Sequence, residues 1–384
     1  MWFFTDEEKQ IRELCKDFAQ NELKPYAAKH DNEESFNINA FKKMGEIGLL
    51  GITAEPEYGG ASMGATAATI VMEELGKECA SSTLSYLAHT ILCVNNIQNN
   101  ASKEQKEKYL PKLISGEWIG CMGMSEPEFG SDAVGIQTKA DPDKDGENYT
   151  LNGSKMWITN AQYADIAYVY TRTGKEKKNL STFILEKEKK HFRFGSPIHK
   201  MGMRASPTGE LIFENAKVSK DHLVGNQGES IYHMMKNLEI ERITISGISL
   251  GIAQACLDNC LKYSTERKQF GKEIGHFQMI QKMLAEMASE VAMMRSFLYT
   301  TCRNYDAGIK GPTEAAMVKL TLPKMATKIA LDAIQIHGGY GYSREFPVER
   351  MLRDNKLNEI GAGTNEIMIL IIAKNLLKEN NLKV

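Results

Sequence analysis

The chain has 384 residues, which is long enough for two or three lobes around a substantial core. Its 47 basic residues nearly balance its 49 acidic residues, so the charge gives no support for binding to nucleic acid or to a membrane surface. The longest uninterrupted apolar run, residues 367–373, is far shorter than the roughly 20 residues that span a bilayer. The seven cysteines show no CxxC pair and no metal-ligand spacing, which predicts a protein of a reducing compartment without a metal site.

The first third of the chain is predicted to be helical. Thr5-Asp-Glu-Glu8 has the pattern of a capping box, and apolar residues follow it at near-helical spacing as far as Leu23. We expect Pro25 to end this helix. Further helical patterns cover roughly residues 40–49, 64–78 and 82–98, and a capping box at 102–105 begins another helix before Gly116.

Between about residue 118 and residue 225 the pattern changes to short strands. The β-rich runs are 149–151, 166–171, 181–185 and 211–213, and clusters of Gly, Asp, Asn and Pro separate them. Long amphipathic helical patterns then return at roughly 230–265, 276–309, 312–337 and 364–379, with a break at 308–312. The sequence therefore predicts an α-helical domain at 1–118, a β-domain at 119–228 and an α-helical bundle at 229–384.

Four short segments stand out from this background. Met122-Gly-Met-Ser-Glu-Pro-Glu-Phe-Gly-Ser-Asp132 is a Ser/Gly/Pro turn, which taken alone is more often structural. Lys155-Met-Trp-Ile-Thr-Asn160 places a tryptophan in a strand, where it usually packs in a core. Glu266-Arg-Lys-Gln-Phe-Gly271 offers a guanidinium that can pair with phosphate oxygens, although such a cluster is commonly a solvated helix end. The glycines of Gln335-Ile-His-Gly-Gly-Tyr-Gly341 permit close approach of the backbone.

With Pro56-Glu-Tyr-Gly-Gly60 and the terminal loop Arg353-Asp-Asn-Lys-Leu-Asn-Glu-Ile-Gly-Ala-Gly-Thr-Asn-Glu366, these segments follow the order and spacing of one family. The chain resembles the acyl-CoA dehydrogenases over nearly its whole length. The resemblance implies the acyl-CoA dehydrogenase-like fold, with an N-terminal α-helical domain, a middle β-domain and a C-terminal α-helical bundle. It also implies FAD as the cofactor, an acyl-CoA substrate, an electron-transfer flavoprotein as the electron acceptor, and a homotetramer.

The same resemblance assigns the residues that would bind FAD. The 122–131 and 157–159 segments would lie along the isoalloxazine, where donors stabilise the charge that arrives with hydride. Glu128 stands where the family usually has a glycine. Arg267 and Gln335 match positions that reach the FAD of a neighbouring subunit. The full set is Met122, Met124, Ser125, Gly130, Ser131, Trp157, Ile158, Thr159, Arg267, Gln269, Phe270, Gln278, Gln335, Gly338, Gly339, Thr364, Asn365 and Glu366.

The terminal loop lacks the family's usual base. Most members have Ile-Tyr-Glu-Gly-Thr there, with the glutamate taking the α-proton, whereas this chain has Gly361 and Ala362. In the isovaleryl-CoA branch of the family, which shares Ile-Gly-Ala-Gly-Thr, the base lies on an earlier helix. Matching that helix assigns the base to Glu241 in Leu238-Glu-Ile-Glu-Arg242. Residues two apart on a helix point about 200° apart, so Glu239 and Glu241 cannot both face one site.

The resemblance also assigns the groups that would contact the substrate. The backbone N–H of Ala362, with a ribityl hydroxyl of the flavin, would polarise the thioester carbonyl. Gly361 removes the phenol that would crowd a branch near Cβ, so we expect a short, branched acyl chain. The residues expected to contact the substrate are Ser131, Glu239, Arg242, Gly361 and Gly363.

Two other functions are compatible with the sequence. One is the reverse reaction, an enoyl-CoA reductase, because the electron partner and metabolite levels set the direction. The other is a flavin-containing lyase or a silent paralogue that only binds acyl-CoA. The acidic residues among the first eight positions are unlike a targeting peptide, so we expect the bacterial cytoplasm, or the mitochondrial matrix for a mature eukaryotic form.

Overall fold

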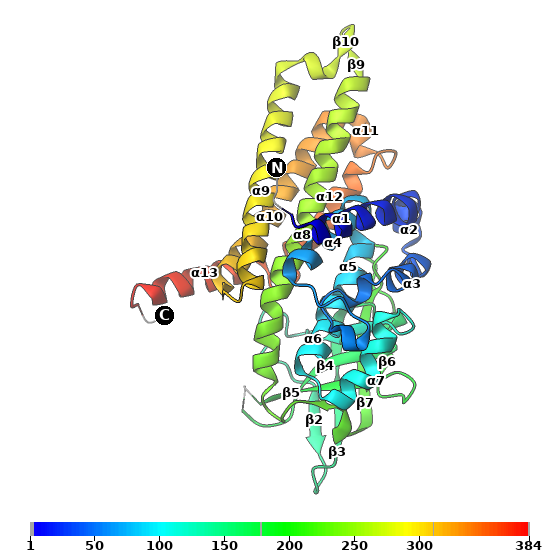
Figure 1. Cartoon of the computed structure of the whole chain (residues 1–384), viewed down its shortest axis with the longest axis vertical. Coiled ribbons are helices and arrows are strands. Elements are labelled where there is room, and N and C mark those ends of the chain that lie inside the picture. The colour runs from blue at the N-terminus through cyan, green and yellow to red at the C-terminus, as the bar shows by residue number, and fades with distance from the viewer. Residues whose placement is uncertain (1–3, 177–178, 310, 383–384) are drawn as a thin grey trace.

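The computed structural model describes residues 4–176, 179–309 and 311–382. Helices, then a β-sheet, then helices follow one another along the chain, as the sequence predicted (Figure 1). The β-sheet lies at one end of the elongated molecule, and the long C-terminal helices extend to the opposite end.

The N-terminal part consists of helices, some of which continue into one another through π-helical turns. Thr5 and Glu8 form the predicted capping box of the first helix. The expectation that Pro25 ends this helix is wrong, because a π-helical turn at Ala19–Leu23 carries the helical path into the next helix. Pro25 lies in the first turn of that helix, where its missing N–H costs no hydrogen bond. The helices are α1 (Asp6–Phe18), α2 (Lys24–Glu33), α3 (Ile38–Glu46), α4 (Ala65–Glu78), α5 (Ala80–Leu87), α6 (Asn95–Asn100) and α7 (Lys103–Ile114).

The middle part is one sheet that buries both of its faces. On the central strand β4 (Ile166–Arg172), Tyr168 and Tyr170 face one apolar cluster and Val169 faces another. This two-sided burial explains why the strand is a continuous apolar run rather than an alternating one. The other strands are β1 (Gly120–Gly123), β2 (Lys139–Pro142), β3 (Asn148–Thr159), β5 (Leu180–Glu186), β6 (Arg193–Phe194), β7 (Thr208–Ser219) and β8 (Leu223–Val224). Their order is β6-β7-β3-β2-β4-β5-β8, and β1 pairs in parallel with β4.

The C-terminal part is a bundle of long helices. The predicted break holds, because α9 ends at Asp306 and α10 begins at Pro312. Residues 353–366 were expected to form one loop, and α12 was not predicted from the sequence. Because α12 includes residues 353–358, only residues 359–364 form the loop. The elements are α8 (Ser230–Glu266), a hairpin of β9 (Lys268–Gln269) and β10 (Lys272–Glu273), α9 (Gln278–Asp306), α10 (Pro312–His337), α11 (Gly339–Tyr342), α12 (Val348–Asn358) and α13 (Asn365–Glu379).

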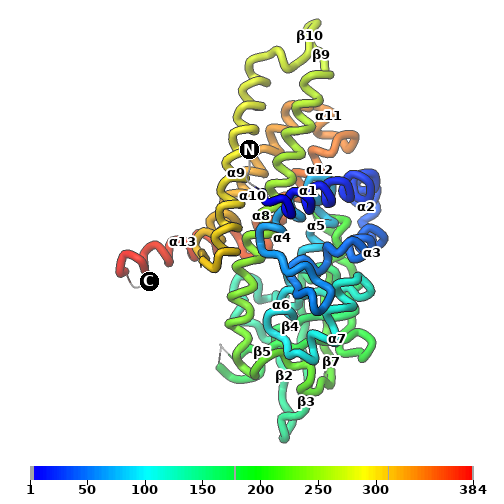
Figure 2. The backbone as a smooth tube through the Cα atoms, in the orientation of Figure 1, coloured from blue at the N-terminus to red at the C-terminus, as the bar shows by residue number. Residues whose placement is uncertain are grey.

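Helix α8 joins all three parts of the molecule. Glycines let it approach α4 closely: a Cβ atom at Gly251 would lie 2.4 Å from the carbonyl oxygen of Glu73. By length and composition α8 could also cross a membrane, but 89% of its most apolar window is buried inside the protein. We therefore read its apolar character as that of a core helix. The tube in Figure 2 shows α8 and α9 running together up to the β9–β10 hairpin, while α13 projects away from the bundle.

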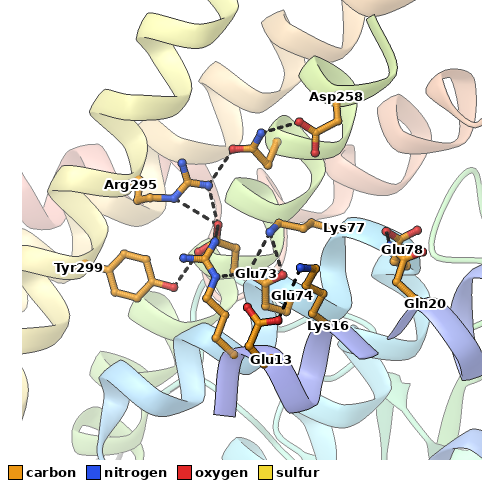
Figure 3. Close-up of polar contacts among 12 residues, drawn as sticks. Glu13, Lys16, Gln20, Glu73, Glu74, Lys77, Glu78, Asp258, Arg295 and Tyr299 are labelled. Carbon is orange, nitrogen blue, oxygen red and sulfur yellow. Dashed lines mark hydrogen bonds and ion pairs between the residues drawn. The ribbon is translucent and has the colours of Figure 1, made fainter. Parts of the chain in front are cut away.

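A buried ionic network fixes the N-terminal helices to the bundle (Figure 3). Glu73 of α4 accepts hydrogen bonds from the Arg295 guanidinium at 2.6 Å and from the Tyr299 hydroxyl at 2.7 Å. Neighbouring Glu74 accepts one from Arg12 of α1 at 2.8 Å. Burial opposes ionisation of Glu73, but the charges of Arg295, Lys77 and Arg12 together outweigh it and lower the pKa of this carboxyl. The pairing compensates the buried charge of Glu73 and ties α4 to α1 and α9.

Candidate active site

A buried lysine joins two of the segments that the sequence singled out. Lys155 of β3 donates hydrogen bonds to the Met124 carbonyl oxygen at 3.1 Å and to the Glu126 carboxylate at 2.7 Å. Glu126 also accepts from the backbone N–H groups of Gln137 and Thr138, at 2.6 and 2.8 Å. Burial lowers the pKa of Lys155 to about 8, and the Lys155 charge lowers the pKa of Glu126 against the effect of its own burial. The 122–131 and 155–160 segments therefore form one surface.

Trp157 does not pack in the core of this surface. Its φ is +65°, it follows an irregularity in the β3–β7 register, and its side chain is 59% exposed. A bulky residue in the left-handed region costs about 1–3 kcal/mol and is typical of functional sites. Ile158 is buried, Thr159 is half-buried and Ser131 is exposed. The 155–160 segment thus presents the aromatic ring of Trp157 outward.

Glu241 is the most unusual carboxyl group of helix α8. Its side chain is buried, and within the described part of the chain its Oε2 atom has no hydrogen-bond partner. Burial raises the pKa of Glu241 to about 7, while the positive charges of Arg242 and Lys319 act in the opposite direction. A carboxyl with this pKa can take up a proton near neutral pH.

The other two charged groups of the same helical turn have different surroundings. Glu239 accepts a hydrogen bond from the backbone N–H of Gly311 at 3.1 Å, so its carboxylate caps the start of α10. Arg242 is half-buried, and its Nε atom has no partner among the described residues. Burial lowers the pKa of Arg242, although Glu241 and Glu239 oppose this effect. Glu239 therefore has a hydrogen-bond partner that Glu241 lacks, and its expected contact with substrate stays a prediction.

The loop between α12 and α13 follows a path set by left-handed backbone. Ala362 has φ +55° and Gly363 has φ +88°. The N–H of Gly361 donates to the Leu357 carbonyl oxygen at 2.8 Å, and the Thr364 hydroxyl caps α13. No acceptor is recorded for the N–H of Ala362 within the described chain, so this amide is available to a ligand. Gly361 has ordinary space around it, because an added Cβ atom would come no closer than 3.5 Å to Leu357.

Lys319 of α10 binds this loop and lies within electrostatic reach of Glu241. Its ammonium donates a hydrogen bond to the Gly363 carbonyl oxygen, and its side chain is completely buried. Burial lowers the pKa of Lys319 to about 8 against the opposing charge of Glu241. The sequence analysis missed this residue. Its signal was a lysine on the apolar stripe of α10, three residues after Ala316 and three before Leu322.

A second group of predicted cofactor residues lies at the other end of the molecule, around the β9–β10 hairpin (Figure 1). Arg267, Gln269, Gly338 and Gly339 line one pocket there, and the Arg267 guanidinium lies 5.6 Å from the centre of the Tyr340 ring. Phe270, at the tip of the hairpin, is 93% exposed, and Gln278 and Gln335 are exposed as well. Within one chain the structure does not bring this group to the Trp157 surface.

The remaining predicted residues cluster with one or the other of these groups. Met122, Met124 and Leu238 pack against the same apolar cluster, which places the 122–131 segment beside α8. Asn365 and Glu366 begin α13, directly after the loop. Gly130 is exposed at the end of its turn, and Ser125 accepts the Met156 N–H through its carbonyl oxygen at 2.9 Å. The described residues contain no group of three or more His, Cys, Asp or Glu side chains that could hold a metal ion.

The fold has a helical part, a β-sheet and a second helical part. Together with the exposed ring of Trp157 and the buried carboxyl of Glu241, it indicates a cofactor-dependent enzyme. Family models agree with this class: the acyl-CoA dehydrogenase N-terminal domain matches residues 5–117, the middle domain 121–216 and the C-terminal domain 228–377. The chain therefore belongs to the acyl-CoA dehydrogenase family. It is an oxidoreductase that dehydrogenates an acyl-CoA.

Individual relatives extend this result. The mitochondrial isovaleryl-CoA dehydrogenase of Solanum tuberosum is 44% identical over 380 residues, which cover 98% of this chain and 92% of the relative. The solved butyryl-CoA dehydrogenase of Megasphaera elsdenii is 34% identical with a TM-score of 0.95, over 98% of this chain and all of that chain. A solved FAD complex of PigA is 29% identical with a TM-score of 0.93, over 98% and 99% of the two chains.

Proposed function

We propose that this protein oxidises a short, branched acyl-CoA to the trans-2-enoyl-CoA, with Glu241 as the base that takes the α-proton. The observation that carries the proposal is the buried Glu241 carboxyl, whose pKa of about 7 contrasts with the absence of a carboxylate at Ala362. The 44% identity to an isovaleryl-CoA dehydrogenase supports the same substrate class. A proton moves from Cα to Glu241, and a hydride equivalent leaves Cβ, so the acyl chain loses two electrons.

FAD is the proposed acceptor of that hydride equivalent. The residues present fit such a group: the exposed Trp157 ring offers a stacking surface, and the accessible hydroxyls of Ser131 and Thr159 offer hydrogen bonds to a flavin edge. When bound, FAD supplies the two-electron chemistry that side chains lack. The backbone N–H of Ala362 polarises the thioester carbonyl, which makes the α-proton more acidic and stabilises the enolate that forms.

The two distant groups of cofactor residues support a shared site. Arg267 has no recorded ion pair in the described chain and lies in a pocket with Gly338 and Gly339, so it can pair with the pyrophosphate of a neighbouring subunit's FAD. The exposed apolar side chains of α13, such as Leu370, support a further contact between copies. We propose a homotetramer that passes electrons to an electron-transfer flavoprotein, in the bacterial cytoplasm or the mitochondrial matrix. A monomer that holds FAD tightly would contradict the shared site.

Replacement of the base tests the proposed reaction. Glu241→Gln should keep FAD and bind acyl-CoA, because the amide is nearly isosteric, yet lose turnover of isovaleryl-CoA by about 10²–10⁴-fold or more. The matched control is Glu239→Gln, which removes a carboxylate two residues away and should cost far less. Steady-state turnover and anaerobic bleaching of the flavin by isovaleryl-CoA measure both. Near-normal turnover by Glu241→Gln would assign the base to another residue and overturn the proposal.

A further inference from the structure

We propose that Lys319 is a positioning residue of the reaction: it fixes the loop that carries the Ala362 N–H and places a positive charge within electrostatic reach of the Glu241 carboxyl group. The inference rests on the proposed role of Glu241 and adds a residue from a third helix. Its basis is one buried ammonium that donates a hydrogen bond to a carbonyl oxygen of the loop and whose charge acts on the carboxyl group on α8.

Two hydrogen bonds hold the loop on either side of Ala362. Ala362 and Gly363 lie in succession in the left-handed region, which costs an alanine of the order of 1 kcal/mol, so the segment needs anchors to keep this path. One anchor is the Gly361 N–H, which donates to Leu357. The other is the hydrogen bond from Lys319 to the Gly363 carbonyl oxygen. Ala362 lies between the two anchors, and its own N–H remains free for a thioester oxygen.

The charges of Lys319 and Glu241 also act on each other. An ammonium group has three N–H donors. The ammonium of Lys319 is fully buried, so its one hydrogen bond to Gly363 does not satisfy it. The charge of Glu241 makes burial of Lys319 less costly, and the charge of Lys319 in turn favours the ionised form of Glu241. Burial alone would raise the pKa of Glu241 further, and the charge of Arg242 together with the smaller effect of Lys319 keeps it near neutrality.

Other charged groups near the pair are few. Those that face Lys319 lie on α8, in the loop after α12 and on α13: Glu241, Arg242, Glu359 and Glu366. Those that face Glu241 are Arg242, Lys319 and the Tyr170 hydroxyl on β4. Glu359 is already bound by Lys356 at 2.8 Å and by Thr327, and Glu366 is exposed. Arg242 is unchanged in the Lys319 variants, so a difference between these variants and the unmodified protein measures the effect of the lysine.

The test uses the FAD-loaded full chain. Lys319→Met and Lys319→Gln both remove the charge, and the control Lys324→Met removes an exposed lysine from the same helix. Loss of the cation should raise the apparent pKa in the kcat–pH profile by about one unit, so that kcat falls roughly fivefold near neutral pH and recovers in part at alkaline pH. Hydrogen–deuterium exchange of residues 359–366 should become faster in Lys319→Met, without any need for turnover.

Each result decides between the alternatives. An unchanged pH profile in either variant that retains FAD would overturn the proposal. Loss of FAD by both variants would also overturn it, because the lysine would then serve folding alone. The test of Lys319 can be separated from the test of the proposed function. Normal turnover by Glu241→Gln would refute the role of Glu241 as the base. An inactive Glu241→Gln, together with a normal pH profile in the Lys319 variants, would refute only the positioning role of Lys319. Lys324→Met should resemble the unmodified protein in every measurement.

Discussion

Glu239 and Glu241 lie two residues apart on α8, yet Glu239 accepts a hydrogen bond from Gly311 at 3.1 Å while one Glu241 oxygen is buried without a partner among the described residues. Helical geometry turns their side chains about 200° apart, so the same short sequence supplies one structural cap and one buried carboxyl group with an oxygen that accepts no hydrogen bond from the described residues.

The stability of the protein should depend on pH through Glu241. The folded-state pKa of this carboxyl is raised to about 7 by burial, so the folded state binds a proton that the unfolded chain releases near its ordinary value of 4.5. The resulting stabilisation is complete below the unfolded pKa and is lost as the pH rises through 7. Glu241→Gln removes this loss, so it should raise Tm at alkaline pH. The corresponding gain in the free energy of unfolding is at most about 3 kcal/mol.

Thermal unfolding of the two proteins at acidic and at alkaline pH measures this effect. The Tm difference between Glu241→Gln and the unmodified protein should be small at acidic pH and should widen as the pH increases. A Tm difference that is the same at both pH values would mean that folding does not raise the pKa of Glu241.

The carboxylate should be movable to the family's common position. Glu241→Gly combined with Ala362→Glu should recover part of the turnover that Glu241→Gly alone loses, because Ala362 already has the left-handed φ that the new residue must adopt. The measurement is kcat for isovaleryl-CoA in the single and double variants. If the double variant is no faster than Glu241→Gly, residue 362 does not face the α-carbon.

Substrate choice should respond to Gly361. Its backbone lies outside the left-handed region and an added Cβ atom meets nothing closer than 3.5 Å, so Gly361→Tyr should fold. The phenol should fill the space for a branch and lower kcat/KM for isovaleryl-CoA more than for butyryl-CoA. A difference of one methyl group in a pocket is worth about 10–200-fold. Equal losses for the two substrates would show that the loop does not select for branching.

The buried network around Glu73 should matter for stability and not for chemistry. Arg295→Ala leaves the Glu73 carboxylate buried without its main partner, which typically costs about 3–5 kcal/mol. The control is Arg193→Ala, which removes a fully exposed pair with Glu214 and should leave Tm unchanged. Chemical denaturation measures both variants. Equal midpoints would mean that Tyr299 and Arg12 suffice to hold Glu73.

Local patterns in the sequence predicted most helices and the buried strands. Capping boxes at Thr5 and Ser102 and the break before Pro312 depend only on neighbouring residues, and the structure has all three. Pro25 was misjudged because a π-helical turn can carry a helical path into a helix that begins near a proline. Helix α12 was missed because its buried polar residues, such as Asn355 and Asn358, hide the apolar periodicity.

The sequence by itself determined the order of the three parts, the family and the residue types available for chemistry, because these follow from local spacing and from motifs. Only the tertiary structure decided which of these residues meet. The hydrogen bond between Lys319 and Gly363 joins positions 44 residues apart, and the contact between Lys155 and Glu126 joins positions 29 apart. The pKa of Glu241 likewise depends on the burial that α8 acquires against its neighbours, and no pattern of nearby residues contains that burial.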